Sequence, residues 1–187
     1  MQNLTISLKS PLLLLCLALL GLTSCADETP ATTADPFADC RYGAPKPIFN
    51  EQVRSIIQHN FRLEEDRAVE TVSFDDGLQL SILQTGCDYI NQEFRFNLTN
   101  PYPGAPASFW IQEAINHFYR LGQLGSAYVI YASVADALNQ KSGRISLGQS
   151  TELQSGFYAR IEDGKSGNGG LLVITLSEQP SGSVASN

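Results

Sequence analysis

Residues 68–84 read Ala68-Val-Glu-Thr-Val-Ser-Phe74, Asp75-Asp76-Gly77 and Leu78-Gln-Leu-Ser-Ile-Leu-Gln84, and this stretch decides the fold class. The apolar residues of the first run share one parity, although Glu70 shares it too and makes the pattern imperfect. Those of the second run, Leu78, Leu80 and Ile82, also share one face. Alternation with a period of two is typical of half-buried strands, and Asp-Asp-Gly is turn chemistry. The stretch therefore predicts a β-hairpin.

Similar patterns follow along the chain. Phe94, Phe96 and Leu98 alternate with polar residues and predict a third strand. Apolar stripes at helical spacing predict two helices, over 110–121 and 128–138. Residues 156–162 and 171–176 flank a Gly-rich turn and predict a second hairpin. Because hairpins imply antiparallel pairing, we expect an α+β fold: an antiparallel sheet of about five strands with two to three helices packed on one face.

A short helix is also predicted before the first hairpin. Its apolar positions follow helical spacing, with Asn50 as a possible N-cap: Phe49, Val53, Ile56, Ile57 and Phe61. His59 would then lie near the C-terminal end of the helix, where a cation suits the helix dipole. The expected order is one helix, three strands, two helices and two strands.

The N-terminus has the three parts of an export signal. Lys9 precedes the apolar run 11–22, which is too short for a transmembrane helix of about 20 residues. Leu22-Thr23-Ser24-Cys25 closes the run. This segment, residues 1–25 only, resembles the lipobox signal of bacterial lipoproteins. The resemblance implies that residues 1–24 are removed and that Cys25 becomes the lipidated N-terminus.

The same resemblance implies a location in the cell envelope. The modification of that family supplies three acyl chains, and stable anchoring needs more than one. Ala26 stands where inner-membrane lipoproteins often carry Asp, which points to the outer membrane, with the domain on its periplasmic or surface face. The alternative is an ordinary cleaved secretory signal followed by an incidental cysteine.

Composition divides the rest of the chain into three parts. Residues 25–39 are rich in Ala, Thr, Asp and Pro and predict a flexible tether. Residues 40–178 are long enough for one α+β domain with a single core, and 179–187 predict a disordered tail. Without residues 1–24 the chain has 11 basic and 19 acidic side chains, a net charge near −8. An acidic chain is a poor candidate for nucleic acid, so the membrane is expected to be reached through the lipid.

Two cysteines remain after processing, because Cys16 leaves with the signal and Cys25 carries the lipid. In an oxidising compartment Cys40 and Cys87 predict one disulfide with both side chains largely buried. It would close a loop of 47 residues. A redox or metal-binding role is disfavoured, since the chain has no CxxC motif and only two histidines. We expect no metal and no cofactor.

Few motifs suggest catalysis. Residues 159–166 fit a loose phosphate-loop pattern ending in Gly164-Lys165-Ser166, but strand-like residues surround it, so we interpret it as part of a hairpin. His59 and His117 are not placed beside a nucleophile motif. The acidic groups 64–66 and 75–76 are interpreted as solvated turns. No catalytic residue is assigned, and an enzyme is disfavoured.

These observations favour a lipid-anchored binding or accessory protein of the cell envelope, without enzymatic activity. Its partner would be an envelope protein or a glycan. The candidate contacts are Tyr102 in the Pro-rich loop, since tyrosine is typical of binding surfaces, and Arg41 and Tyr42 beside Cys40 as the rim of a site. The alternatives are that Tyr102 covers the end of the following helix and that Arg41 and Tyr42 belong to a strap over the core. The alternative is a small envelope hydrolase acting on peptidoglycan or glycan. An enzyme should show a cleft with converging polar groups and shifted pKa values, whereas a binding module should show a shallow apolar or aromatic patch.

Overall fold

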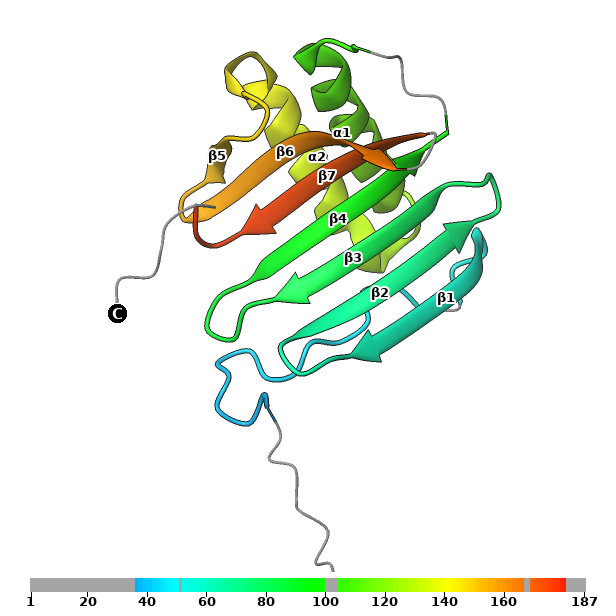
Figure 1. Cartoon of the computed structure of the whole chain (residues 1–187), viewed down its shortest axis with the longest axis vertical. Coiled ribbons are helices and arrows are strands. Elements are labelled where there is room, and N and C mark those ends of the chain that lie inside the picture. The colour runs from blue at the N-terminus through cyan, green and yellow to red at the C-terminus, as the bar shows by residue number, and fades with distance from the viewer. Residues whose placement is uncertain (1–35, 51, 100–103, 167–168, 181–187) are drawn as a thin grey trace, which may run out of the picture. The chain divides into compact units, whose positions relative to one another are not determined.

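The computed structural model describes residues 36–50, 52–99, 104–166 and 169–180. Seven strands form one antiparallel sheet in the order β1-β2-β3-β4-β7-β6-β5 (Figure 1). Two α-helices and two 3₁₀ turns connect β4 to β5. The elements are β1 Ile56–Leu63, β2 Arg67–Phe74, β3 Gln79–Thr85, β4 Asn91–Leu98, α1 Ala107–Gly122, η1 Ser126–Tyr128, α2 Val129–Lys141, η2 Ser142–Arg144, β5 Ser150–Gln154, β6 Phe157–Ser166 and β7 Gly169–Ser177.

The predicted fold class is confirmed: the protein is α+β with an antiparallel sheet, and the two helices lie on one face of it (Figure 1). The sheet has seven strands where about five were expected. β1 replaces the predicted first helix, and β5 is a short strand of five residues that the sequence pattern did not indicate. The two predicted hairpins correspond to β2–β3 and β6–β7.

The core lies between the sheet and the helices. Every second residue of the central strands is buried, including Phe94 and Phe96 on β4 and Ile174 on β7. The ring of Phe118 on α1 packs against Phe94 at 5.3 Å and against Tyr131 on α2 at 5.9 Å, measured between centroids. Gly122 lets the two helices approach closely, because a Cβ there would lie 2.7 Å from the backbone nitrogen of Ala132.

The predicted helix over residues 49–61 is wrong. Residues 56–63 form the edge strand β1, paired antiparallel with β2, and Ile57 at a helical core position is 69% exposed. Phe49 and Val53 are buried as predicted, but they belong to an irregular segment before the strand. The side chain of Asn50 accepts a hydrogen bond from Gln52 N–H at 3.0 Å, so its capping chemistry closes a turn and not a helix.

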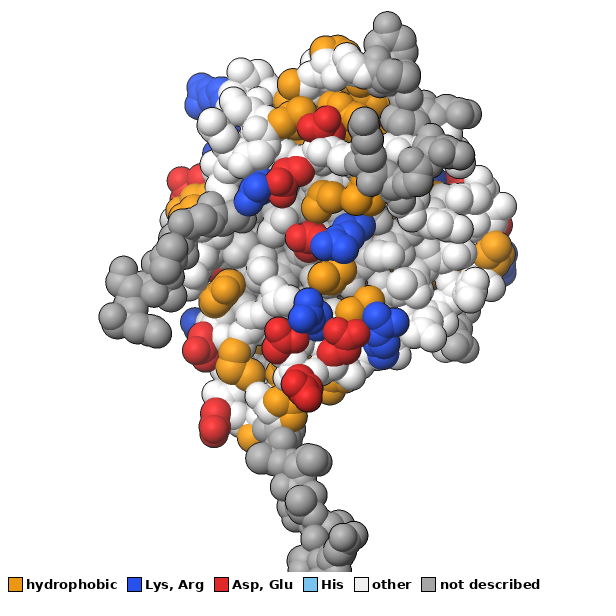
Figure 2. Space-filling view, in the orientation of Figure 1, with side chains coloured by type: hydrophobic (Ala, Val, Ile, Leu, Met, Phe, Trp, Pro, Cys, Tyr) orange, Lys and Arg blue, Asp and Glu red, His pale blue; other side chains and the backbone are white. Residues whose placement is uncertain are grey.

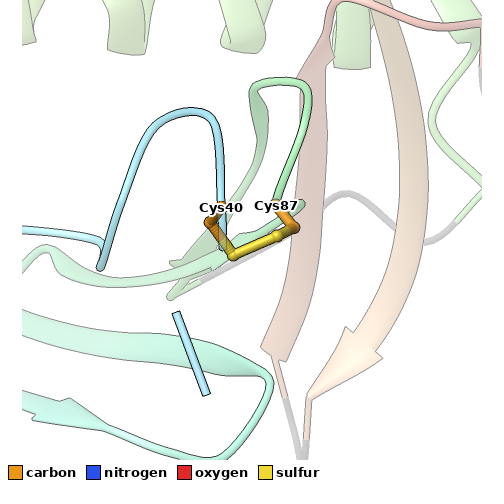
Figure 3. Close-up of a disulfide and its surroundings, with 2 residues drawn as sticks. All are labelled: Cys40 and Cys87. Carbon is orange, nitrogen blue, oxygen red and sulfur yellow. A yellow bond between two sulfur atoms is a disulfide. The ribbon is translucent and has the colours of Figure 1, made fainter. Parts of the chain in front are cut away.

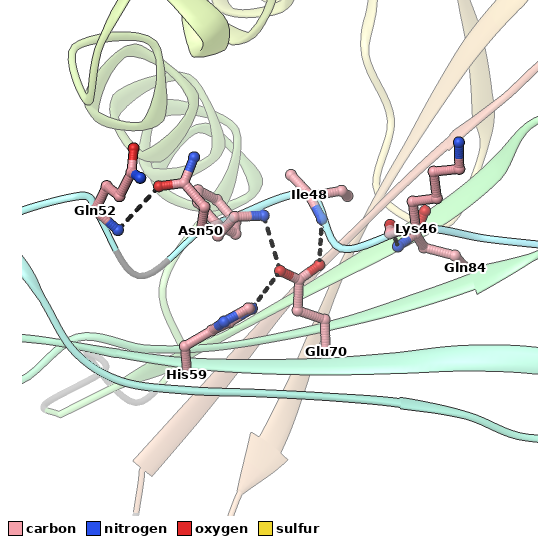
Figure 4. A network of polar contacts seen from close by, with 8 residues as sticks. Lys46, Ile48, Asn50, Gln52, His59, Glu70 and Gln84 are labelled. Carbon is pink, nitrogen blue, oxygen red and sulfur yellow. Dashed lines mark hydrogen bonds and ion pairs between the residues drawn. The ribbon is translucent and has the colours of Figure 1, made fainter.

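A buried carboxylate holds this segment on the sheet (Figure 4). Glu70 on β2 has no exposed surface, and its two oxygens accept hydrogen bonds from the N–H groups of Ile48 and Phe49, each at 2.8 Å. His59 Nε2 lies 2.8 Å from Oε1 of the same group. His59 therefore belongs to a strand network, and the expectation that it lies at a helix end is wrong. Glu70 shares the parity of the apolar residues because it points into the core.

The predicted disulfide is present between Cys40 and Cys87, with a Cα–Cα distance of 4.6 Å (Figure 3). It joins the chain before the irregular segment to the turn between β3 and β4. The expectation of burial is wrong, since Cys87 is exposed and Cys40 half-buried. The bridge acts at the rim of the fold, where it ties down a segment that few backbone hydrogen bonds hold.

The opposite face of the sheet carries the outward residues of the strands. Figure 2 shows acidic and basic side chains next to one another there, between hydrophobic ones. The ion pairs include Arg95–Glu93 and Arg160–Glu162, which join neighbouring positions of one strand. In both pairs the basic group is matched by an acidic one on the same strand.

Several predictions fall outside the described residues. These are the lipidation at Cys25, the contact residue Tyr102 and most of the tether and tail. Within residues 25–39, the described part begins at Pro36, and there the side chain of Phe37 is buried. In the portion of the chain that the structure describes, no helix has both the length and the apolar character required to cross a membrane.

Candidate functional site

A polar cavity of about 410 Å³ opens between α1, the turn after β2 and the end of β4. We call it the α1 pocket. Its volume lies in the range of small-molecule sites, roughly 300–1,000 Å³. It is lined by Asp76, Gly77, Leu78, Asn97, Leu98, Thr99, Phe109, Glu113, His117 and Arg120.

Helical spacing explains which side chains of α1 reach the pocket. Phe109, Glu113 and His117 are four residues apart, and Arg120 follows three residues later, so all four share one face of the helix. The neighbouring face carries the core residues. The β2–β3 turn meets this face from the sheet side and contributes Asp76.

Asp76 and Arg120 form a two-point ion pair at the α1 pocket. Arg120 reaches the two carboxylate oxygens through NH1 and NH2, each at 2.6 Å. Asp76 Oδ1 also accepts the Leu78 N–H at 3.1 Å. The hydrogen bond from Arg120 is the main cause that lowers the pKa of Asp76. Gly77, with φ of +89°, allows the tight turn that presents this carboxylate.

His117 lines the pocket with a side chain that is mostly buried. Its ring stacks on Phe96 with 4.5 Å between centroids and 9° between planes, and its side chain is 12% exposed. The pKa of His117 is lowered to about 4, chiefly by burial and also by the charge of Arg120, while the charge of Asp76 opposes the shift. The imidazole is therefore neutral at neutral pH.

The neutral imidazole leaves two polar groups without strong partners. Nε2 of His117 is buried and has no hydrogen bond. The nearest carboxylate oxygen, Oε2 of Glu113, is 3.8 Å away, beyond hydrogen-bond distance. Buried polar groups usually have hydrogen-bond partners. Of the three such atoms without one in the described residues, Nε2 of His117 is the one whose residue lines the α1 pocket.

The chemistry of the α1 pocket suits binding better than catalysis. A general base works best with a pKa near the operating pH, and the pKa of His117 is far below it. The carboxylate of Asp76 is engaged by Arg120. Thr99 is the single hydroxyl-bearing residue in the lining that the structure describes. What remains available is a carboxylate on Glu113, an amide on Asn97 and the ring of Phe109.

The contacts predicted beside the disulfide lie elsewhere. Tyr42, 46% exposed, lines a second cavity of about 390 Å³ with residues of the β3–β4 turn. Its hydroxyl donates to Glu178 at 3.0 Å, which raises the pKa of Tyr42. The guanidinium of Arg41 lies 5.2 Å from the Tyr42 ring centroid. Arg41 and Tyr42 thus contact each other, but the Tyr42 hydroxyl is already hydrogen-bonded to Glu178.

A third cavity, of about 380 Å³, lies between α2 and the β5–β7 side of the sheet. Its lining contains no charged residue and includes Ile130, Val134 and Phe157. Among the aromatic residues of the helical region, Trp110, Tyr128 and Tyr131 are buried, and Tyr119 is half-buried. Residues 159–166 belong to β6 and pair with β7, so the phosphate-loop interpretation is excluded by the strand that follows.

The residues of the α1 pocket were not predicted as a site. The spacing of Glu113 and His117 on one helix was visible, but nothing in the sequence indicated that Asp76 folds against the same helix. Among the described residues, no three His, Cys, Asp or Glu side chains lie close enough to hold a metal ion.

Comparison with known proteins adds no family. No family model matches the chain, and no curated protein and no solved structure is significantly similar to it.

Proposed function

We propose that this protein is a lipid-anchored, non-enzymatic binding protein of the cell envelope and that it binds a small polar ligand in the α1 pocket. The observation that carries the binding role is the buried, unpartnered Nε2 of His117 beside a cavity lined by further polar groups.

The anchor is supported by the lipobox-like residues 22–25 and by the composition of residues 26–39. A polar tether of this length allows the domain to reach ligands at some distance from the membrane. The net charge near −8 supports attachment through lipid, because an acidic domain is repelled by anionic lipid surfaces.

One observation favours a second candidate, a small envelope hydrolase that acts on peptidoglycan or glycan. Two carboxylates, on Asp76 and Glu113, line the same cavity, and paired carboxylates are the machinery of glycoside hydrolysis. The general acid of such a pair needs a raised pKa, whereas the pKa of Asp76 is lowered by Arg120. This contrast makes binding the better supported function.

Ligand binding by the full-length protein in detergent tests the proposal. Fragments of envelope glycans and peptides are screened by thermal shift and then by two-dimensional NMR. Binding should perturb residues of α1 and the β2–β3 turn, and Asn97→Ala should weaken it. Glu93→Gln on the open face of the sheet is the matched control. Perturbation confined to other surfaces, or turnover of a glycan fragment, would contradict the proposal.

A further inference from the structure

We infer that the ligand of the α1 pocket is a small hydroxylated molecule with a free primary ammonium group, as in a deacetylated amino sugar, and that Glu113 is the residue that recognises this group. The inference rests on the proposed function, because it assigns a ligand class to the same pocket.

The formal charges of the residues that line the α1 pocket do not cancel. Asp76 and Arg120 neutralise each other through two contacts of 2.6 Å. His117 is neutral because it is buried. Glu113, 29% exposed, is then the one lining residue in the described chain whose formal charge has no oppositely charged partner. The pocket thus has a net charge of −1, which disfavours anionic ligands and favours a cation.

The neutrality of His117 is what keeps the Glu113 carboxylate available. A protonated imidazole four residues away on the same helix would pair with it. In the structure the two groups remain 3.8 Å apart without a hydrogen bond. The Glu113 carboxylate accepts hydrogen bonds, and Nε2 of His117 accepts one when the ring proton is on Nδ1, so a donor bound at Glu113 has a second acceptor 3.8 Å from that carboxylate oxygen.

An ammonium group meets these requirements better than a hydroxyl. It supplies three donors and a positive charge, and a hydrogen bond between charged groups is about twice as strong as a neutral one. Asn97 and Thr99 offer further acceptors in the same lining, and the ring of Phe109 can face a cation or the apolar face of a sugar. The amide and hydroxyl groups also suit the remaining hydroxyls of a sugar.

The other cavities lack this combination. Next to the second cavity, the carboxylate of Glu178 already accepts hydrogen bonds from the Tyr42 hydroxyl and from the Ile90 N–H, the latter at 2.9 Å. It is therefore not free to bind a cationic ligand. The third cavity has no charged lining residue. A further cavity of about 510 Å³ has Arg54 as its charged lining residue and contains no carboxylate. Among these cavities of the described residues, the α1 pocket is therefore the one suited to a cationic group.

The test compares three probes that differ at one substituent: D-glucosamine, D-glucose and N-acetyl-D-glucosamine. Their affinities for the full-length protein in detergent are measured by NMR titration at a pH where the amine is protonated. Glucosamine should bind about tenfold more tightly than the other two. Glu113→Gln should remove this preference, whereas Glu113→Asp should retain much of it. Glu93→Gln should leave the preference unchanged, and melting curves verify that each variant is folded.

The outcomes separate the inference from the proposed function. Equal affinity for the three probes, or a preference for glucosamine that persists in Glu113→Gln, would overturn the inference but leave the pocket as a binding site. Failure of glucosamine to bind up to about 10 mM would also overturn it. The proposed function would fail as well if the wider ligand screen left the residues of the α1 pocket unperturbed or if a glycan fragment were turned over.

Discussion

Nε2 of His59 on β1 lies 2.8 Å from Oε1 of Glu70 on β2, and this contact completes the coordination of a carboxylate that has no exposed surface. The same carboxylate accepts the N–H groups of Ile48 and Phe49. It thereby links the edge of the sheet to the irregular segment that covers it. A buried charge is tolerated only when its hydrogen bonds are complete, and here three donors supply them.

Replacing Glu70 by Ala should destabilise the protein by about 3–5 kcal/mol. The variant leaves two buried N–H groups and an imidazole without their acceptor, and a cavity where the side chain lay. Urea denaturation measures the change in the free energy of unfolding. Glu93→Ala, in an exposed pair on the open face of the sheet, is the control and should cost less than about 1 kcal/mol. Equal effects of the two substitutions would show that the network contributes little.

The same network explains where prediction from sequence failed. Val53, Ile57 and Phe61 follow helical spacing, but residues 56–63 form hydrogen bonds with β2, and the reach of His59 to Glu70 requires an extended chain. The spacing of apolar residues within a short window contains no information about a hydrogen-bond partner that lies eleven residues further along the chain. The hairpins and both later helices were predictable, because their apolar pattern and their turns lie within one short window. β5 has too few residues for a pattern to emerge.

Acidification should destabilise the protein through His117. The pKa of this imidazole is lowered from 6.5 to about 4, chiefly by burial and also by the charge of Arg120, while the charge of Asp76 opposes the shift. As the pH falls from 6.5 toward 4, the unfolded chain binds a proton that the folded protein excludes, so stability is present above this window and declines within it. The decline amounts to at most about 3 kcal/mol.

Comparison with His117→Gln isolates this contribution. Unfolding free energies of both proteins are measured between neutral pH and pH 4, and contributions from groups other than His117 are common to both curves. The wild-type curve should fall more steeply than that of the variant. Parallel curves would show that His117 titrates normally in the folded protein.

Reduction of Cys40–Cys87 should lower the melting temperature by several degrees. The bridge spans 47 residues, which corresponds to about 4 kcal/mol in the chain-entropy model. In a domain of this size the melting temperature falls by about 2–4 °C for each kcal/mol lost from the free energy of unfolding. The double variant Cys40→Ser/Cys87→Ser should match the reduced wild-type protein in thermal melts. Because Cys87 is exposed, mild reductant should suffice without denaturant. An unchanged melting temperature in both forms would contradict a stabilising role.

Cys25→Ser should release the protein from the membrane. The substitution removes the thiol that lipoprotein processing requires, and residues 11–22 are too short to span the bilayer. Intact-mass analysis of the wild-type protein should show acyl chains on Cys25, and Cys16→Ser is the matched control that should leave fractionation unchanged. Retention of Cys25→Ser in the detergent phase at the wild-type level would refute the anchor.

The α1 pocket illustrates why a site is harder to predict than a fold. Glu113 and His117 are neighbours on a helix, and their spacing was visible in the sequence. Their chemistry depends on contacts across the fold: Phe96 under the imidazole, and Asp76 against Arg120 from a turn 44 residues away. The Asp75–Gly77 turn was predicted for its backbone geometry, and only the tertiary structure gives Asp76 a second role.

The two members of the Asp76–Arg120 pair should affect amine binding in opposite directions. Asp76→Asn leaves the Arg120 guanidinium without its carboxylate, so the cation is free to approach Glu113 and to repel an ammonium ligand; affinity for glucosamine should fall about tenfold. Arg120→Gln instead leaves Asp76 as a second unpaired carboxylate, which favours a cation, so affinity should be retained or increase. NMR titration of both variants in parallel measures this asymmetry, and melting curves control for folding. If the variants weakened binding equally, the pair would serve only to hold the turn against α1, and the charge-based account of the pocket would be wrong.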